Sequence, residues 1–283
     1  MLEVFSEFDF CTEKCYHTVL VVVVVMKEKV ENNMHCFYTE KENIVGRQAY
    51  ITGSDVNHVR NVLRMEVGEE IIICDGEGVF HTCVIKEISK EQVEAQILES
   101  KEAETELKTK ITLFQGLPKK DKMELIIQKA VELGVHEIVP VSTRFCVAKI
   151  EDAKKEKKKL ERWQEIAKAA AKQSGRGMIP QIKPVMTYKE ALKAASGMDR
   201  AVIPYEKAEG MKAAVEEVGK MAKCQSVGIF IGPEGGFAEE EIQSALDTGV
   251  TPISLGKRIL RTETAGLCIL SVLMFEIEKN NEV

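Results

Sequence analysis

The chain has 283 residues, 45% of them hydrophobic and 30% charged, and its formal net charge is −6. This composition describes a soluble globular protein of one large or two ordinary domains. Its eight cysteines form no C-x-x-C pair and have no histidine at metal-ligand spacing, which argues against a disulfide or zinc framework and indicates reduced thiols in a cytosolic protein.

The first 33 residues contain an apolar run, Val19–Met26, that is too short to span a bilayer. Acidic residues precede this run where a signal peptide carries positive charge, and no small-residue cleavage site follows it. We therefore expect residues 1–33 to be a non-native or unstructured extension of a cytoplasmic protein without a membrane partner. Met34 is the expected true first residue.

Residues 34–104 contain several short apolar runs typical of β-strands. Asp75–Gly78 is a hairpin turn signal between two of these runs. The sequence therefore predicts a small β-rich domain at this end of the chain. The expected strands are Gln48–Ile51, Glu70–Cys74, Val79–Ile85 and Val93–Leu98.

A short helix is expected to interrupt these strands, with Ser54 or Asp55 as its cap. The helical spacing places Arg60 and Arg64, four residues apart, on one face. Such a pair is either a solvated surface or a phosphate clamp, because the planar guanidinium group binds phosphate well.

Over residues 105–283, strand-like and helix-like segments alternate, which predicts an α/β fold with a mainly parallel sheet covered by helices. The charged, glycine-free stretch Glu99–Lys110 predicts the linker before it. The last helix, Ala265–Phe275, is apolar on every side, so we expect it to be buried all round, inside its own domain or against a second subunit. The expected strands are Ile111–Gln115, Glu137–Val141, Arg200–Pro204, Ser226–Ile231 and Thr251–Leu255. The other expected helices are Lys119–Leu133, Ala153–Gln173, Tyr188–Ala195, Gly210–Met221 and Ala238–Thr248.

Positive charge is concentrated in residues 117–176, which carry fifteen Lys and Arg against nine Asp and Glu. Nucleic-acid binding depends on such a local footprint. The stretch ends in Gln173, Ser174, Gly175 and Arg176, where Gly175 is expected to end the preceding helix. This segment is either a plain helix stop or, as we favour, an RNA contact made from a loop by Gln173, Ser174 and Arg176.

Two turns near the C-terminus follow strands and precede helices, which is where α/β proteins assemble their sites. The first, Ile231–Phe237, contains three glycines that allow positive φ angles and close approach of a ligand to the backbone. It is not a phosphate loop, because it lacks both the Walker and the dinucleotide patterns. Glu234 and the acidic residues 239–241 would repel a polyphosphate, so a cationic or zwitterionic ligand fits better.

The second turn contains three cations, Lys257, Arg258 and Arg261, just before the final helix. Cations are unfavourable there, beside the positive end of a helix dipole. Thr262 or Thr264 is the expected N-cap, but capping gives no reason for the cations. Residues placed against a local rule are often functional, and these three indicate an anionic partner.

Together these segments resemble the RsmE family of ribosomal RNA methyltransferases. The resemblance implies an α/β domain with a SPOUT-type trefoil knot over residues 105–283. It also implies a small PUA-like β-barrel RNA-binding domain over residues 34–104, and a homodimer. Cys36 departs from the family pattern, which has an arginine near this position, and this puts that RNA contact in doubt. The matching motifs are His58–Arg64, Gln173–Arg176, Gly232–Gly236, Leu255–Gly256 and Leu260–Ala265.

By this resemblance the protein would use S-adenosylmethionine to methylate N3 of a uridine in 16S ribosomal RNA, within the small ribosomal subunit and without a metal. Arg261 is the expected stabiliser of charge developing on the uracil ring. Glu263 is either a general base or a residue that holds the cofactor or Arg261. The expected cofactor-binding residues are Pro204, Gly232, Glu234, Gly236, Leu255, Gly256, Ile259, Leu260, Arg261 and Thr264.

Three other functions stay open. A nucleotide-triphosphate enzyme is the weakest of them, because the phosphate-loop patterns are absent and the charge has the wrong sign. A SPOUT-class ribose 2′-O-methyltransferase acting on rRNA or tRNA shares the glycine-rich turn, although its last loop has an Asn/Ser-type motif in place of Arg261–Thr264. A non-catalytic RNA-binding protein would need neither turn.

Overall fold

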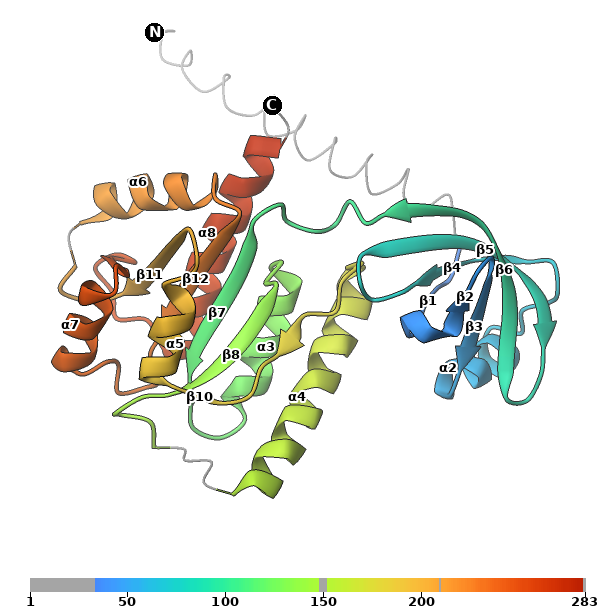
Figure 1. Ribbon diagram of the computed structural model, residues 1–283, viewed down its shortest axis with the longest axis horizontal. Coiled ribbons are helices and arrows are strands. Elements are labelled where there is room, and N and C mark those ends of the chain that lie inside the picture. Colours follow the sequence, from blue (N-terminus) through green and yellow to red (C-terminus); the bar gives the residue numbers. More distant parts are fainter. Residues whose placement is uncertain (1–33, 148–151, 209, 282–283) are drawn as a thin grey trace, which may run out of the picture. The chain divides into compact units, whose positions relative to one another are not determined.

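The computed structural model describes residues 34–147, 152–208 and 210–281 (Figure 1). The chain divides into two compact units. Among the described residues, the first unit contains 34–73 and His81–Ser100, and the second contains Cys74–Phe80 and those from Lys101 onward. The extension expected over residues 1–33 lies outside the described residues.

The first unit is built on a six-stranded sheet with the order β1-β4-β5-β6-β3-β2. Its strands alternate between buried and more exposed side chains, so that Ile71 and Ile73 of β4 face the same core as Val93, Ala95 and Ile97 of β6. The strands are β1 Cys36–Tyr38, β2 Ile44–Val45, β3 Gln48–Thr52, β4 Glu70–Cys74, β5 Val79–Ile88 and β6 Gln92–Glu102.

The helix expected in this unit consists of an α-helical turn, α2 Ser54–Asn57, and a π-helical turn, η2 His58–Val62, preceded in the chain by the short 3-10 helix η1 Lys41–Asn43. The residue before α2 is Gly53, which has no side chain to cap it. The expected cap at Ser54 or Asp55 is therefore wrong.

The two arginines of this region do not share one regular helix. Val56 and Val59 are buried, as the apolar pattern predicts. However, Arg64 lies beyond the helix in left-handed backbone with a φ of 54°, whereas Arg60 lies within the π-helical turn. The expected common face is wrong, because the helix ends before it reaches Arg64.

The second unit contains a seven-stranded sheet with the order β10-β8-β7-β12-β11-β13, and β9 also pairs with β8. The strand pairs of this sheet are parallel, which confirms the predicted α/β fold with a mainly parallel sheet. Its strands are β7 Lys110–Gly116, β8 Glu137–Ser142, β9 Gln181–Ile182, β10 Met186–Thr187, β11 Arg200–Pro204, β12 Ser226–Ile231 and β13 Thr251–Ile253. Its helices are α3 Lys122–Glu132, α4 Ala153–Ser174, α5 Tyr188–Ala195, α6 Met211–Met221, α7 Glu239–Asp247 and α8 Thr262–Asn281.

Two apolar cores lie on the two faces of this sheet. Ile111 and Leu113 of β7 belong to the core formed with α3, α4, α6 and α8, whereas Phe114 belongs to the core formed with α5 and α7 (Figure 1). This division follows from the two-residue period of a strand, which turns successive side chains to opposite faces.

The final helix differs from its prediction. It begins at Thr262 instead of Ala265 and continues to Asn281. Leu270 and Leu273 are fully buried, but Val272 is 49% and Phe275 is 70% exposed. The expectation that this helix is buried all round within its own domain is therefore wrong, because α8 packs on one side only.

The expected linker is also shorter than predicted. Strand β6 continues to Glu102 and β7 begins at Lys110, which leaves residues 103–109 between them. These residues belong to the second unit, where Glu106 has a structural partner described below.

The six cysteines among the described residues form no disulfide bond with one another, while Cys11 and Cys15 lie outside that part of the chain. Across residues 34–147, 152–208 and 210–281, no helix is both long and apolar enough for a membrane crossing. Within the same residues, no group of three or more His, Cys, Asp and Glu side chains is placed to hold a metal ion.

Candidate active site

A pocket of about 660 Å³ lies where β11, β12 and β13 end. Its wall is formed by residues 231–237 at and after the end of β12 and residues 254–262 after β13. It is completed by Pro204, Tyr205 and Glu206 at the end of β11, by Lys122 at the start of α3 and by Ala265 in α8. In this sheet the chain passes from β7 to β8 on one side, whereas β12 lies on the other side of β7. The strand order therefore changes direction next to β12, whose end forms part of the pocket. Ligands of open α/β sheets bind at such switch points, outside the carboxyl ends of strands.

The pocket gathers the residues that the resemblance predicted for the cofactor. Nine of the ten positions line it, and their role in binding stays a prediction. The exception is Thr264, which does not line the pocket and is exposed on the first turn of α8. The nine are Pro204, Gly232, Glu234, Gly236, Leu255, Gly256, Ile259, Leu260 and Arg261.

Two glycines of these turns have structural reasons to be glycine. A Cβ atom added to Gly235 would lie 2.8 Å from the Cβ atom of Phe145, so a side chain there would collide with the protein itself. Gly256 has a φ of 108°, a conformation that other residues adopt only with strain. Both glycines therefore have a reason in the fold itself, and the approach of a ligand to the backbone of these turns stays a prediction.

A buried hydrogen-bond network joins the two turns. The Thr262 hydroxyl donates to the carbonyl oxygen of Gly232 at 2.6 Å and accepts from Nε2 of Gln115 at 3.0 Å. Gln115, at the end of β7, is completely buried and also donates to the Gly116 carbonyl at 2.9 Å. The Thr262 hydroxyl thus ties the start of α8 to the glycine-rich turn. This use replaces the capping role expected for it, and the sequence did not single out Gln115.

Arg261 and Glu263, the two expected catalytic residues, differ in exposure. The Arg261 side chain is 80% exposed, and that of Glu263 is only 16% exposed. One guanidinium nitrogen of Arg261 lies 4.0 Å from Oε1 of Glu263, the outer limit of an ion pair. Arg261 therefore lines the pocket as a largely solvated cation, whereas Glu263 is mostly shielded from solvent.

Lys122 is a third charged residue of the site, which the sequence analysis missed. It is the first residue of α3, and its Nζ lies 3.1 Å from Oε1 of Glu234 and 3.1 Å from Oε2 of Glu263. Oε2 of Glu263 has no directed hydrogen bond in the described residues, so its contact with Lys122 is an ion pair without hydrogen-bond geometry. The Glu234 carboxylate, and to a smaller degree that of Glu263, raise the pKa of Lys122 above 10.5.

The two carboxylates respond in the opposite direction. Partial burial acts to raise the pKa of Glu263, but its own backbone N–H, Lys122 and Arg261 outweigh burial and lower the pKa. For Glu234, burial is likewise outweighed by backbone N–H groups, including that of Lys119, and by Lys122, so its pKa is lowered. Both side chains are therefore ionised at neutral pH, and the charge of Glu234 is compensated within the protein.

A signal for Lys122 was present in the sequence. Lys119 and Lys120 come just before α3, and Lys122 is its first residue. This is the same placement of cations against a helix dipole that drew attention to Arg261. The signal was missed because the helix was expected to begin at Lys119, whereas it begins three residues later, at Lys122.

Comparisons with known proteins bear on these observations. The RNA methyltransferase domain family matches residues 105–274, and the RNA methyltransferase PUA domain family matches residues 51–98. Ribosomal RNA small subunit methyltransferase E of Bacillus subtilis is 39% identical over 231 residues, which cover 81% of this chain and 90% of the relative. The chain belongs to the ribosomal RNA small subunit methyltransferase E family.

Solved structures of similar proteins agree with this family. A small subunit methyltransferase E from Neisseria gonorrhoeae, bound to S-adenosyl methionine, is 34% identical, with a TM-score of 0.72 over 86% of this chain and 98% of that one. A Legionella pneumophila methyltransferase in complex with the same cofactor is 33% identical, with a TM-score of 0.72 over 85% of this chain and 97% of that one. The resemblance that the sequence motifs indicated is thereby confirmed.

The residues expected to bind RNA divide into two groups. Arg60, Arg64 and Gln173 are exposed, and Cys36, which stands at the departure from the family pattern, is exposed on β1. The Ser174 hydroxyl instead donates to the carbonyl oxygen of Ala170 at 2.8 Å within α4.

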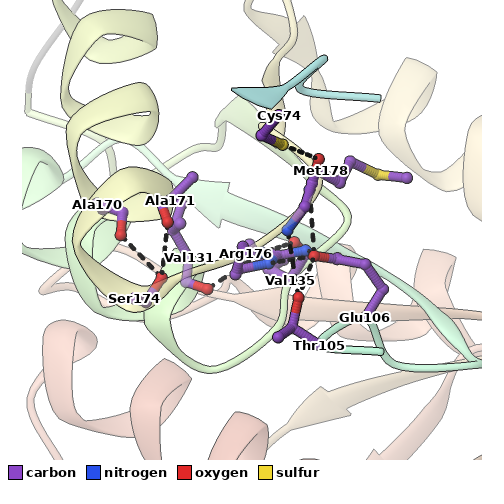
Figure 2. Close-up of polar contacts among 11 residues, drawn as sticks. Cys74, Thr105, Glu106, Val131, Val135, Ala170, Ala171, Ser174, Arg176 and Met178 are labelled. Atoms are coloured by element: carbon purple, nitrogen blue, oxygen red, sulfur yellow. Dashed lines mark hydrogen bonds and ion pairs between the residues drawn. The ribbon is translucent and has the colours of Figure 1, made fainter. Parts of the chain in front are cut away.

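Arg176 is the clear correction. Its side chain is only 4% exposed and forms an ion pair with Glu106 (Figure 2). One guanidinium nitrogen also donates to the carbonyl oxygens of Val131 and Val135, at 3.1 and 2.7 Å. Gly175 ends α4 in left-handed backbone, as predicted, but the chain then turns inward. The expectation that Arg176 contacts RNA from a loop is wrong, because its donors are used inside the protein.

Proposed function

We propose that this chain transfers the methyl group of S-adenosylmethionine to N3 of a uridine in 16S ribosomal RNA, in the cytoplasm. The observation that carries the proposal is the pocket lined by the two turns, with the exposed guanidinium of Arg261 beside it. Similar proteins of the same family are named for small subunit ribosomal RNA, and one of them was solved with the cofactor bound.

The reaction breaks the bond between the sulfonium sulfur and its methyl group and forms a bond from that methyl to N3. S-adenosylhomocysteine leaves, and the N3 proton passes to solvent. N3 lies in the Watson–Crick edge, so the uracil must be unpaired or flipped out of its stack. Holding the sulfonium and N3 in line supplies much of the acceleration.

Arg261 is the proposed catalytic residue. As N3 loses its proton, negative charge spreads onto the neighbouring carbonyl oxygens of uracil. A guanidinium group beside the pocket stabilises that charge, and the Arg261 side chain is 80% exposed.

RNA contacts are proposed for each unit separately, at Arg60 and Arg64 in the first unit and on the first turns of α4 in the second. There Lys154, Lys155 and Lys158 are exposed, and each is able to neutralise a phosphate. Charge reversal of Arg60 and Arg64 is expected to weaken RNA binding and flatten its dependence on salt, with cofactor affinity unchanged. Binding measured across a salt series tests this, and an unaltered salt slope would make both arginines plain surface residues.

The finer architecture belongs to the same proposal. We propose a trefoil knot in the domain 105–283, closure of the β-rich domain 34–104 into a barrel, and assembly into a homodimer. The exposed apolar side chains of Val272 and Phe275 on α8 support the dimer, since solvent exposure of such side chains is unfavourable. Light scattering of the purified protein measures the oligomeric state.

Nucleoside analysis tests the proposed function directly. The full chain would be incubated with isotopically labelled S-adenosylmethionine and small subunits that lack the modification, and the digested RNA analysed by mass spectrometry. We expect label in 3-methyluridine. Label on ribose would instead identify a 2′-O-methyltransferase, and absence of cofactor binding by calorimetry would identify a non-catalytic RNA-binding protein.

A further inference from the structure

Lys122 connects the two turns that form the pocket. Glu234 belongs to the turn after β12, and Glu263 lies in the first turn of α8. The Nζ atom of Lys122 is within 3.1 Å of a carboxylate oxygen of each. Because α3 begins at Lys122, the positive end of that helix disfavours a cation at this position. The two carboxylates outside the helix provide the compensation.

Each of the two carboxylates has a second contact. Glu234 also accepts from the backbone N–H of Lys119, at 3.1 Å, which fixes the turn to the segment before α3. The other oxygen of Glu263 faces Arg261 at 4.0 Å. A chain of charges therefore runs from the glycine-rich turn through Lys122 and Glu263 to Arg261.

We propose that Lys122 is a positioning residue for the methyl transfer, which holds the two turns together and, through Glu263, orients the guanidinium group of Arg261. This inference rests on the proposed function. In it Lys122 does not touch the reacting atoms, and Glu263 acts as the ionised support of Arg261. The lowered pKa of Glu263 agrees with this role, since a carboxylate between two cations is a poor proton acceptor.

The main variant is Lys122→Met, which keeps an unbranched side chain one atom shorter and removes its charge. The matched control is Lys129→Met on the same helix, because Lys129 pairs with Glu132 at 2.8 Å and does not line the pocket. At saturating cofactor we expect Lys122→Met to slow single-turnover methylation roughly ten- to a hundredfold, the scale of a small misplacement in an active site. The cofactor Kd is expected to change less than about threefold.

Hydrogen exchange gives a second readout that does not need activity. The amides of Thr264 and Ala265 donate to the Arg261 carbonyl, at 2.9 and 2.8 Å. If Lys122 holds this turn through Glu263, both amides exchange faster in Lys122→Met and regain protection in Lys122→Arg. Lys129→Met should leave their exchange unchanged.

A double-variant cycle tests the path through Glu263. If Lys122 acts through this carboxylate, adding Glu263→Gln to Lys122→Met slows methylation little beyond either single change. Effects that multiply would mean independent roles and would overturn the proposal.

The remaining outcomes are also decisive. A folded Lys122→Met protein with the rate and exchange of the control overturns the proposal, as does a rate loss fully explained by weaker cofactor binding, which would make Lys122 a cofactor ligand. If Lys122→Met does not fold, Lys122→Gln replaces it, because its amide still donates to a carboxylate. If the natural chain methylates no uridine, the proposed function fails, and the exchange of Thr264 and Ala265 still decides whether Lys122 couples the turns.

Discussion

Two clusters of cations and carboxylates in the second unit have different surroundings. Arg176 is 4% exposed, and its partner Glu106 is 18% exposed. Around the pocket, the Lys122 side chain is 30% exposed and that of Arg261 is 80% exposed. In the first cluster, the guanidinium group is surrounded by a carboxylate and backbone carbonyls. In the second cluster, Arg261 shares the Glu263 carboxylate with Lys122, and most of the Arg261 side chain stays open to a ligand.

The comparison shows how structural and functional arginines are told apart. Both Arg176 and Arg261 lie in motifs that resemble the family pattern, so the motif alone does not separate them. Burial and saturation of the donors do. A buried ionic group that loses its partner destabilises the fold, whereas an exposed pair contributes little to stability and is available for binding.

The largest expected effect is that of Arg176→Met. The change leaves Glu106 and the carbonyl oxygens of Val131 and Val135 without this donor. We expect the free energy of unfolding to fall by about 3–5 kcal/mol, measured by urea denaturation. RNA affinity per folded molecule should be unchanged. A small stability loss combined with weaker RNA binding would contradict the structural role.

Arg261→Ala should behave in the opposite way. We expect single-turnover methylation to fall by about a hundredfold or more, the scale seen when one oxyanion-type donor is removed. The unfolding free energy and the cofactor affinity should change little, since the interaction is made chiefly in the transition state. Lys193→Ala, at an exposed cation of α5 that does not line the pocket, is the control. A rate loss matched by lost cofactor affinity would remove Arg261 from the catalytic role.

Thr262→Val tests the neutral network beneath the pocket. The valine keeps the shape of the side chain but leaves the Gly232 carbonyl and the Gln115 amide without the hydroxyl between them. We expect a loss of about 1–3 kcal/mol of unfolding free energy, measured by thermal denaturation. Thr264→Val, at an exposed position two residues later, should change stability far less. Equal effects of the two substitutions would mean that the hydrogen bonds of Thr262 do not add to the free energy of unfolding.

The smallest expected effect is a pH dependence of the Lys122 cluster. The pKa values of Glu234 and Glu263 lie below the ordinary value of 4.5 in the folded protein. Their contribution to stability is therefore present above about pH 4.5 and is lost as the pH falls through the lowered values. Lys122 stays protonated throughout, because its pKa is raised above 10.5.

Melting temperatures of the natural chain and of Lys122→Met from pH 7 to pH 3 measure this contribution. We expect the difference between the two proteins to be constant above pH 4.5 and to shrink below it. A difference that stays the same at pH 3 would mean that Lys122 stabilises the fold by packing, without its carboxylate partners.

The fold class and the two turns that line the pocket could be predicted from the sequence. Alternating strand and helix patterns predicted the parallel sheet, because periods of two and 3.6 residues are local properties of the chain. The two turns could be located in the same way, since each lies next to the strand that positions it. Their motifs also indicated the family, which the comparisons confirmed.

The contacts of several of these side chains could be known only from the packed structure. Glu106 precedes Arg176 by 70 residues, and Lys119 precedes Glu234 by 115. No local pattern reports which of such distant residues meet. For the same reason the sequence pattern assigned Arg176 to RNA and missed Lys122. The ion-pair partner and the burial of a charged residue arise only when strands and helices pack. Its role therefore depends on tertiary contacts as well as on its position in the chain.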